Sequence, residues 1–344
     1  MKYNQLGNSD LKVSQFALGC MGFGKGSGKS VNDRSWTVGQ EQADQVIAHA
    51  LDLEVNFFDT APAYQAGASE RILGTALNKL ADRDQVVVAT KFATRLPEEM
   101  KKGISGKEHV VNSLDQSLEN LQMDYVDLYI YHIWDWLTPM EEIAEGLNEV
   151  VKQGKARYIG ISNAYAWQIA QMNAYMKEHD YPQFVSIQDH YNLIYREDER
   201  KLFTFAHENN LGLTPYSPLA SGRLAHPFGT ETARRKQDTF SAKEKYGKTV
   251  EIDRPIIDRV EELAKKHDVP MAAISLAWLK TKVTAPIVGA TKAHHLDAME
   301  KALQLDLTSD EVAYLEEPYK PHDLEGVMAD NRDRKHNWTD YLTH

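Results

Sequence analysis

The feature that most constrains the fold is a regular alternation of short apolar runs with segments of helical period. Several runs are apolar almost throughout, as is typical of parallel strands that are covered on both faces. Each run is rich in β-branched or aromatic residues. Eight such runs are found, at residues 15–18, 55–58, 86–89, 126–131, 157–161, 184–187, 212–215 and 285–288.

Segments with a hydrophobic period near 3.6 residues lie between these runs. Residues 41–53, 69–80 and 140–151 each place their apolar side chains on one face, which predicts amphipathic helices. Two further helical patterns, 256–267 and 271–282, lie between the seventh and eighth runs. Eight strands that alternate with helices predict an α/β protein with a closed (β/α)8 TIM barrel.

The sequence also predicts an N-terminal hairpin, one long loop and a C-terminal tail. Residues 3–6 and 11–13 flank a turn and predict a hairpin that caps the bottom of the barrel. A long polar loop, 221–251, follows the seventh strand, and loops of that length are usually functional. We expect one barrel domain over residues 1–320 and a C-terminal tail over 321–344.

An open, doubly wound sheet is the alternative architecture, and it requires a glycine-rich dinucleotide fingerprint after the first strand. Residues 19–30 are rich in glycine, but no GxGxxG can be placed there. A P-loop that ends on Gly28-Lys29-Ser30 would need glycine at position 23, which is Phe23. We therefore interpret this segment as a loop over the barrel mouth.

Charge and cysteine content limit the partners and the compartment. The net charge of −11 gives no general attraction for nucleic acid or for an anionic membrane. No run approaches the eighteen apolar residues of a membrane span, and the first residues do not resemble a signal peptide. The single cysteine, Cys20, cannot form an internal disulfide, which fits a reducing compartment. We expect a cytoplasmic protein that acts on small molecules.

Four titratable residues lie at or near the ends of successive predicted strands, where barrel enzymes carry their catalytic groups. Asp59 and His132 directly follow the second and fourth runs, Lys91 follows the third run after Thr90, and Tyr64 comes five residues after Asp59. A nearby ammonium favours the phenolate form of a tyrosine and makes it a better acid. The combination predicts that Tyr64 protonates a developing alkoxide, with Lys91 held by Asp59 and His132 beside the substrate oxygen.

Six motifs along the chain form a recognisable set: FFDTAPAY, VVVATKF, DYVDLYIYH, GKARYIGISN, FVSIQDHYNL and LTPYSPLASGRL. With these motifs the chain resembles the aldo-keto reductases, and most closely their bacterial, aryl-alcohol-dehydrogenase-like branch. The resemblance implies an enzyme that uses NAD(P)H to reduce aldehydes or ketones. It assigns the catalytic roles to Asp59, Tyr64, Lys91 and His132, with Tyr64 as proton donor and the nicotinamide as hydride donor.

The resemblance also implies an NADP cofactor, with NADPH preferred over NADH, and it assigns residues to each part of it. Met299 and His295 depart from the family pattern at the adenine end, whereas Lys292 offers a cation for the 2′-phosphate. Carried over one by one, the cofactor residues are Ser162, Asn163 and Gln188 for the carboxamide, Tyr216 for the ring, Ser217, Leu219, Gly222, Leu224 and Arg234 for the pyrophosphate, and Val288, Gly289, Ala290, Thr291, Lys292 and His295 for the adenosine end.

The substrate side is predicted from apolar residues in the loops after the first and fourth strands. These residues could line an apolar pocket near Tyr64, or some could simply pack the loops. They are Met21, Phe23, Trp36, Trp134 and Trp136.

Two other functions remain possible at this point. A metal-dependent hydrolase needs several His or Asp ligands at strand ends, and only His132 and His190 lie near one, so we expect no metal. An NADPH-binding regulatory subunit with little turnover would keep the same cofactor residues. The expected partner is a small carbonyl or alcohol substrate, and the oligomeric state does not follow from the sequence.

Overall fold

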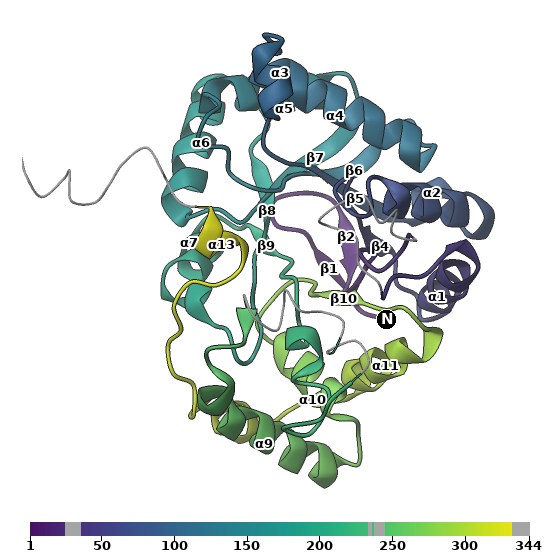
Figure 1. Ribbon diagram of the computed structural model, residues 1–344, viewed down its shortest axis with the longest axis vertical. Helices are drawn as coiled ribbons and strands as arrows, with labels where there is room; N and C mark the ends of the chain where they lie inside the picture. Colours follow the sequence, from purple (N-terminus) through teal and green to yellow (C-terminus); the bar gives the residue numbers. More distant parts are fainter. Residues whose placement is uncertain (25–35, 233–235, 237–244, 332–344) are drawn as a thin grey trace, which may run out of the picture.

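The computed structural model describes residues 1–24, 36–232, 236 and 245–331. Eight parallel strands form one curled sheet in the order β10-β3-β4-β5-β6-β7-β8-β9 (Figure 1), and each falls on one of the predicted apolar runs. The strands are β3 (Ala17–Gly19), β4 (Phe57–Asp59), β5 (Val87–Phe92), β6 (Val126–Tyr131), β7 (Ala156–Ser162), β8 (Phe184–Gln188), β9 (Gly212–Leu213) and β10 (Ile287–Gly289).

Backbone hydrogen bonds just beside β9 and β10 bring the two ends of the sheet together. The Thr284 N–H donates to the Leu213 carbonyl at 2.9 Å, and the Ile287 N–H donates to the Pro215 carbonyl at 2.9 Å. These bonds close the ring, and the (β/α)8 fold predicted from the sequence is confirmed.

Helices surround the sheet on its outside (Figure 1). In α1 the buried residues include Val46, Ile47 and Ala50, which are the side chains that the helical period placed on the inner face. The helices between and after the strands are α1 (Gln40–Asp52), α2 (Ala68–Leu80), α3 (Pro97–Lys101), α4 (Gly106–Leu121), α5 (Met140–Lys152), α6 (Ala166–Glu178), α7 (Leu202–Glu208), α9 (Val250–His267), α10 (Met271–Leu279), α11 (Asp297–Gln304), α12 (Ser309–Glu316) and α13 (Val327–Asp330).

The long connection after β9 is anchored more firmly than its polar sequence suggests. It contains the 3-10 turn η3 (Ala220–Gly222), and the side chains of Leu224 and Tyr246 are fully buried in a second hydrophobic cluster with Trp278 of α10. All nine residues of α10 are buried, so this helix is an inner element. Both described ends of the predicted loop therefore pack on the barrel.

The N-terminal hairpin closes the lower end of the barrel, as predicted. It consists of β1 (Tyr3–Gln5) and β2 (Lys12–Ser14), and Leu6 and Val13 pack into a cluster with residues at the strand starts. Gly7 has φ +55°, and a Cβ there would lie 2.1 Å from the Val185 carbonyl oxygen, so the turn requires glycine.

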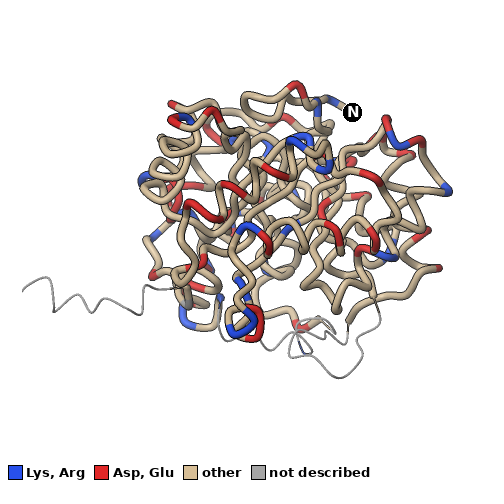
Figure 2. The backbone as a smooth tube through the Cα atoms, turned by 90° about the horizontal axis from the view of Figure 1, so that it is seen from above, with Lys and Arg blue, Asp and Glu red and all other residues tan. Residues whose placement is uncertain are grey.

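The residues after α12 extend to the loop after β6, where Trp136 Nε1 donates to the Asn331 carbonyl at 3.3 Å. His322 and Glu325 are buried, and His322 Nε2 forms an ion pair with Asp253 Oδ1 of α9 at 3.0 Å. Acidic and basic residues are interspersed along the backbone in Figure 2, with 50 acidic against 39 basic residues in the sequence. None of the helices in the described ranges is long and apolar enough to cross a membrane.

Candidate active site

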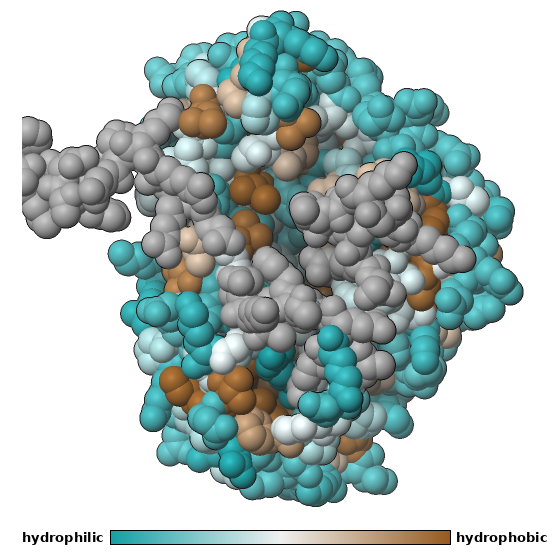
Figure 3. All heavy atoms as spheres, in the orientation of Figure 1, coloured by the Kyte–Doolittle hydropathy of each residue, from teal (hydrophilic) through white to brown (hydrophobic). Residues whose placement is uncertain are grey.

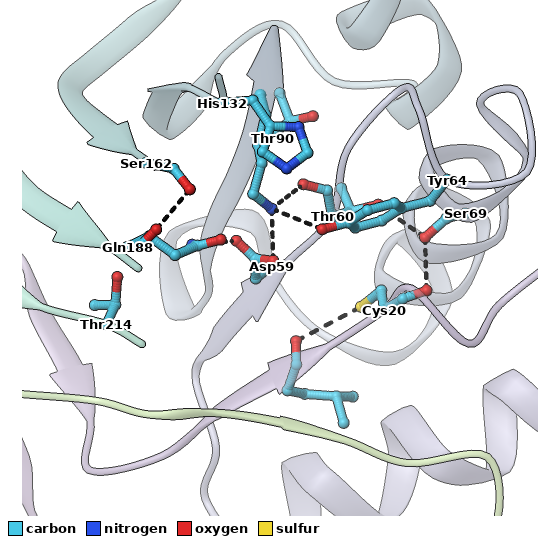
Figure 4. A network of polar contacts seen from close by, with 12 residues as sticks. Cys20, Asp59, Thr60, Tyr64, Ser69, Thr90, His132, Ser162, Gln188 and Thr214 are labelled. Carbon is cyan, nitrogen blue, oxygen red and sulfur yellow. Dashed lines mark hydrogen bonds and ion pairs between the residues drawn. The ribbon is translucent and has the colours of Figure 1, made fainter. Parts of the chain in front are cut away.

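Asp59, Tyr64 and His132 lie together at the carboxyl ends of the strands (Figure 4), and hydrogen bonds from Lys91 to Asp59 and Tyr64 add the fourth predicted catalytic residue. Tyr64 and His132 lie in the loops after β4 and β6, as predicted. Asp59 is the last residue of β4, and Lys91 lies inside β5, so the predicted strand ends were too early at both positions. This face of the barrel is hollowed at its centre in Figure 3.

Lys91 is the centre of the cluster and is fully buried. Its Nζ donates to Asp59 Oδ1 at 2.6 Å, to the Thr60 carbonyl at 2.8 Å and to the Tyr64 hydroxyl at 3.4 Å. Burial alone lowers the pKa of Lys91, but the charge of Asp59 and the contacts with Tyr64 outweigh it, so the pKa is raised. Lys91 is therefore a fixed buried cation beside the tyrosine hydroxyl.

Asp59 connects this cation to the next group of polar residues. Its Oδ1 pairs with Lys91, and its Oδ2 accepts a hydrogen bond from Gln188 Nε2 at 2.9 Å. Both carboxylate oxygens thus have partners, which a buried charge requires. The bond also fixes the Gln188 side chain at the end of β8, on the same side of the barrel as the catalytic cluster.

His132 packs its ring edge-on against Tyr64, with 6.2 Å between the ring centroids and an interplanar angle of 88°. Burial, followed by the positive charge of Lys91, lowers the pKa of His132 to about 3. The imidazole is neutral at physiological pH and can donate one hydrogen bond, but it has no second proton to release.

A second polar group lies beside the first, at the ends of β7, β8 and β9. The Tyr216 hydroxyl donates to Asn163 Oδ1 at 2.8 Å, and Asn163 Nδ2 donates to the His132 carbonyl at 2.9 Å and to Ser162 Oγ at 2.8 Å. Ser162 Oγ in turn donates to the Gln188 carbonyl at 2.5 Å. The structure thus brings together Ser162, Asn163, Gln188 and Tyr216.

Comparison with known proteins identifies the family to which the chain belongs. The model of the aldo/keto reductase family matches residues 16–320, which is most of the chain. The chain belongs to the aldo/keto reductase family. It is therefore an oxidoreductase that acts on carbonyl or alcohol groups, as members of this family do.

Individual relatives in this family cover nearly the same length. The chain is 37% identical over 93% of its length to a Saccharomyces cerevisiae protein named as an aryl-alcohol dehydrogenase, of which the match covers 98%. It is 36% identical, with the same two coverages, to the versiconal hemiacetal acetate reductase of Aspergillus parasiticus. It is 35% identical to the aldo-keto reductase dtxS3 of Metarhizium robertsii over 94% of this chain and 92% of that protein. All three come from fungi, so they give no support to a bacterial branch.

In this aldo/keto reductase the loop after β9 has an unusual backbone. Ser217, Ala220, Ser221 and Gly222 all have positive φ values between +47° and +89°. Such turns can point successive N–H groups at an anion. Lys245 lies against the same loop, with its Nζ 3.4 Å from Ser217 Oγ and 4.7 Å from the centre of the Tyr216 ring.

The other predicted pyrophosphate residues differ in accessibility. Leu219 is half-buried, whereas the Leu224 side chain is fully buried and its carbonyl accepts from Ser275 Oγ at 3.0 Å. Leu224 can therefore support the loop but does not present its side chain to a ligand. Arg234 lies outside the described residues.

The segment at the end of β10 presents part of its predicted adenosine site to solvent. Gly289, Lys292 and His295 are exposed, Thr291 is half-buried, and the Thr291 N–H donates to His295 Nδ1 at 3.4 Å. Val288 and Ala290 are buried. Met299 is also buried, in the main hydrophobic cluster, so its side chain belongs to the core and does not face a ligand.

The five apolar residues predicted for the substrate pocket separate into two kinds. Phe23 is fully buried in the main cluster and Trp134 is buried against Tyr131, which matches the packing alternative. Met21, Trp36 and Trp136 are half-buried.

Several residues that shape the site were missed. The Thr60 carbonyl binds Lys91 and could have been expected, because it directly follows Asp59. Lys245 and Trp167 gave no signal in the sequence, although Trp167 is 54% exposed beside Trp136, with 6.2 Å between ring centroids. Within the described ranges no three His, Cys, Asp or Glu side chains are grouped so as to hold a metal ion.

Proposed function

We propose that this aldo/keto reductase reduces aldehydes or ketones to alcohols, reversibly, with NADPH as the hydride source and Tyr64 as the proton donor. The observation that carries the proposal is the buried Lys91, whose ammonium bridges Asp59 and the Tyr64 hydroxyl. A cation fixed beside a phenol stabilises the phenolate that forms when the proton leaves.

The chemistry assigns one role to each polar group. Bound NADPH supplies the hydride that adds to the carbonyl carbon. As that bond forms, the electrons of the C=O bond move to the substrate oxygen. Tyr64 transfers its proton to this oxygen, and Lys91 stabilises the resulting phenolate. Neutral His132 donates a hydrogen bond to the same oxygen and orients it.

The residues present fit a dinucleotide whose amide lies near the catalytic cluster. Ser162, Asn163 and Gln188 offer amide and hydroxyl groups suited to a carboxamide, and Tyr216 offers an aromatic face. The positive-φ turn with Lys245 suits a pyrophosphate. Exposed Lys292 beside Thr291 suits a 2′-phosphate, which supports NADPH over NADH.

The apolar residues near the site and the single cysteine bear on the substrate class and on the cellular compartment. Half-buried Met21, Trp36 and Trp136 suit an apolar substrate, and the aryl-alcohol-dehydrogenase-like branch fits such a pocket. We expect the protein to work in the cytoplasm, where NADPH is available and the single Cys20 stays reduced.

The test is the steady-state oxidation of NADPH with a panel of aldehydes, for the wild type and Tyr64→Phe. The variant keeps the ring and removes the acid, so turnover is expected to fall by about 10²–10⁴ while NADPH affinity stays within a factor of two or three. Turnover by Tyr64→Phe close to the wild-type rate would contradict the assignment of the acid. NADPH binding without turnover on any aldehyde would instead favour the regulatory subunit.

A further inference from the structure

Asp189, which directly follows β8, is tied to both neighbouring strand ends. Its carboxylate accepts hydrogen bonds from the backbone N–H groups of Asn163 and Ala164, after β7. Its backbone carbonyl accepts from the Tyr216 N–H, after β9, at 3.0 Å. The side chain is only 5% exposed. One residue thus braces the two loops that carry Asn163 and Tyr216.

Asn163 needs this brace because its backbone is strained. Its φ is +51°, in the left-handed region that residues other than glycine adopt at some cost, although asparagine tolerates it best. The hydrogen bond from its N–H to Asp189 stabilises that conformation. The conformation in turn aims the Asn163 side chain so that its Oδ1 meets the Tyr216 hydroxyl at 2.8 Å.

The remaining carboxylate oxygen of Asp189 points away from these partners. Asp189 lines a small internal cavity with Ile187, Asp198 and Pro215. Its Oδ2 is buried and makes no hydrogen bond to any residue in the described part of the chain. The side chain therefore acts on the site through Asn163.

We propose that Asp189 is a positioning residue that fixes Asn163 and Tyr216 in the geometry needed to hold the nicotinamide end of the cofactor. This role rests on the proposed function, because it assumes that Asn163 and Tyr216 contact the nicotinamide. It predicts that loss of the brace weakens binding of the nicotinamide and leaves the adenosine end unaffected, since Lys292 and Thr291 follow β10, whereas the hydrogen-bond partners of Asp189 follow β7 and β9.

The experiment compares two ligands and two substitutions. The ligands are NADPH and 2′-phospho-ADP-ribose, which lacks the nicotinamide, and their dissociation constants are measured by titration calorimetry. Asp189→Ala removes the acceptor for the Asn163 N–H. Asp189→Asn is the matched control, because its amide oxygen can accept the same bond and its NH2 group can point into the cavity toward Asp198.

Asp189→Ala is expected to weaken NADPH binding about tenfold or more, because a buried N–H is left without a partner, and to leave 2′-phospho-ADP-ribose binding within twofold. Asp189→Asn is expected to bind both ligands within threefold of the wild type. If Asp189→Ala does not fold, Asp189→Ser replaces it, because the shorter side chain places no oxygen at the position where Asp189 Oδ1 accepts from the Asn163 N–H.

Other results would overturn the proposal. Equal weakening of both ligands would show that Asp189 only supports the fold, and no change in NADPH binding would show that the brace is not needed. A wild-type protein that binds 2′-phospho-ADP-ribose and NADPH equally tightly would overturn it too, because the nicotinamide would then gain nothing from Asn163. If the wild type binds neither ligand, the proposed function itself fails, which is distinct from a failure of Asp189 alone.

Discussion

Separating the structural role of Lys91 from its proposed catalytic role is the sharpest test of the site. Lys91 and Asp59 are both buried and their charged atoms are 2.6 Å apart. In Lys91→Met the carboxylate of Asp59 keeps one side-chain partner, Gln188 Nε2, and loses its cation. Removing one member of a buried ion pair costs about 3–5 kcal/mol because the other charge stays buried without compensation. We expect Lys91→Met to lose stability in that range.

The double variant Asp59→Asn/Lys91→Met removes both charges and leaves none uncompensated. Its loss of stability is expected to be smaller than the sum of the two single losses, by several kcal/mol, because each single variant includes the cost of the charge that the other removes. Turnover, unlike stability, should not be partly recovered in the double variant. Without the ammonium beside Tyr64, both Lys91→Met and the double variant are expected to lose about 10²-fold or more in turnover.

The assay combines urea unfolding, followed by tryptophan fluorescence, with NADPH oxidation at saturating aldehyde. Lys79→Met is the matched control, since Lys79 is an exposed lysine on α2, and it should change neither quantity measurably. Single losses that add within about 0.5 kcal/mol would show that Lys91 and Asp59 are not a coupled pair. Recovery of turnover in the double variant would refute the role of the ammonium.

Three further outcomes are expected. Lys292→Ala should weaken NADPH binding about 10-fold to 150-fold and leave NADH almost unchanged; equal weakening in titrations of both cofactors would remove Lys292 as the discriminator. Burial raises the pKa of Asp189 to about 7, so the folded state retains its proton between about pH 4 and 7. The wild type should therefore lose unfolding free energy relative to Asp189→Asn as pH rises through that window, by up to about 1.4 kcal/mol per unit, and parallel urea curves would contradict this. Burial lowers the pKa of His322, but the hydrogen bond and charge of Asp253 outweigh burial, so the pKa is raised. The His322–Asp253 ion pair therefore stabilises the folded state fully below about pH 6.5, and this stabilisation is lost as the pH rises through the raised pKa. The stability gap between the wild type and His322→Ala should thus be larger at pH 6 than at pH 9; an equal gap would show that the charge of His322 is irrelevant.

The barrel could be predicted because its strands are covered on both faces and are therefore apolar runs. The same rule explains the errors at β4 and β5. Charged residues end an apolar run in the sequence, so the predicted strands stopped before Asp59 and Lys91. Both residues belong to their strands, and each neutralises the other in the barrel interior, a pairing between positions 32 residues apart that no local pattern reveals.

The role of Asp189 could not be predicted for a related reason. It depends on the register of β7 against β8, which pairs Ser162 with Gln188 and so places Asn163 beside Asp189. Local sequence does not fix that register. The burial of the apolar residues near the barrel mouth could not be predicted either. Phe23 and Trp36 are both aromatic residues in the loop after β3, yet Phe23 is fully buried in the core and Trp36 is half-buried.

The electrostatics of the site support the proposal that Tyr64, and not His132, is the acid. Lys91 keeps its proton because Asp59 lies beside it, and both oxygens of Asp59 already have partners. No second anion of the catalytic cluster is available to His132, so burial and the nearby ammonium hold its pKa at about 3 and the ring stays neutral. A charged imidazole there would place two cations together in a buried site. Of Lys91, His132 and Tyr64, only Tyr64 combines a transferable proton with a cation positioned to stabilise the charge that it leaves behind.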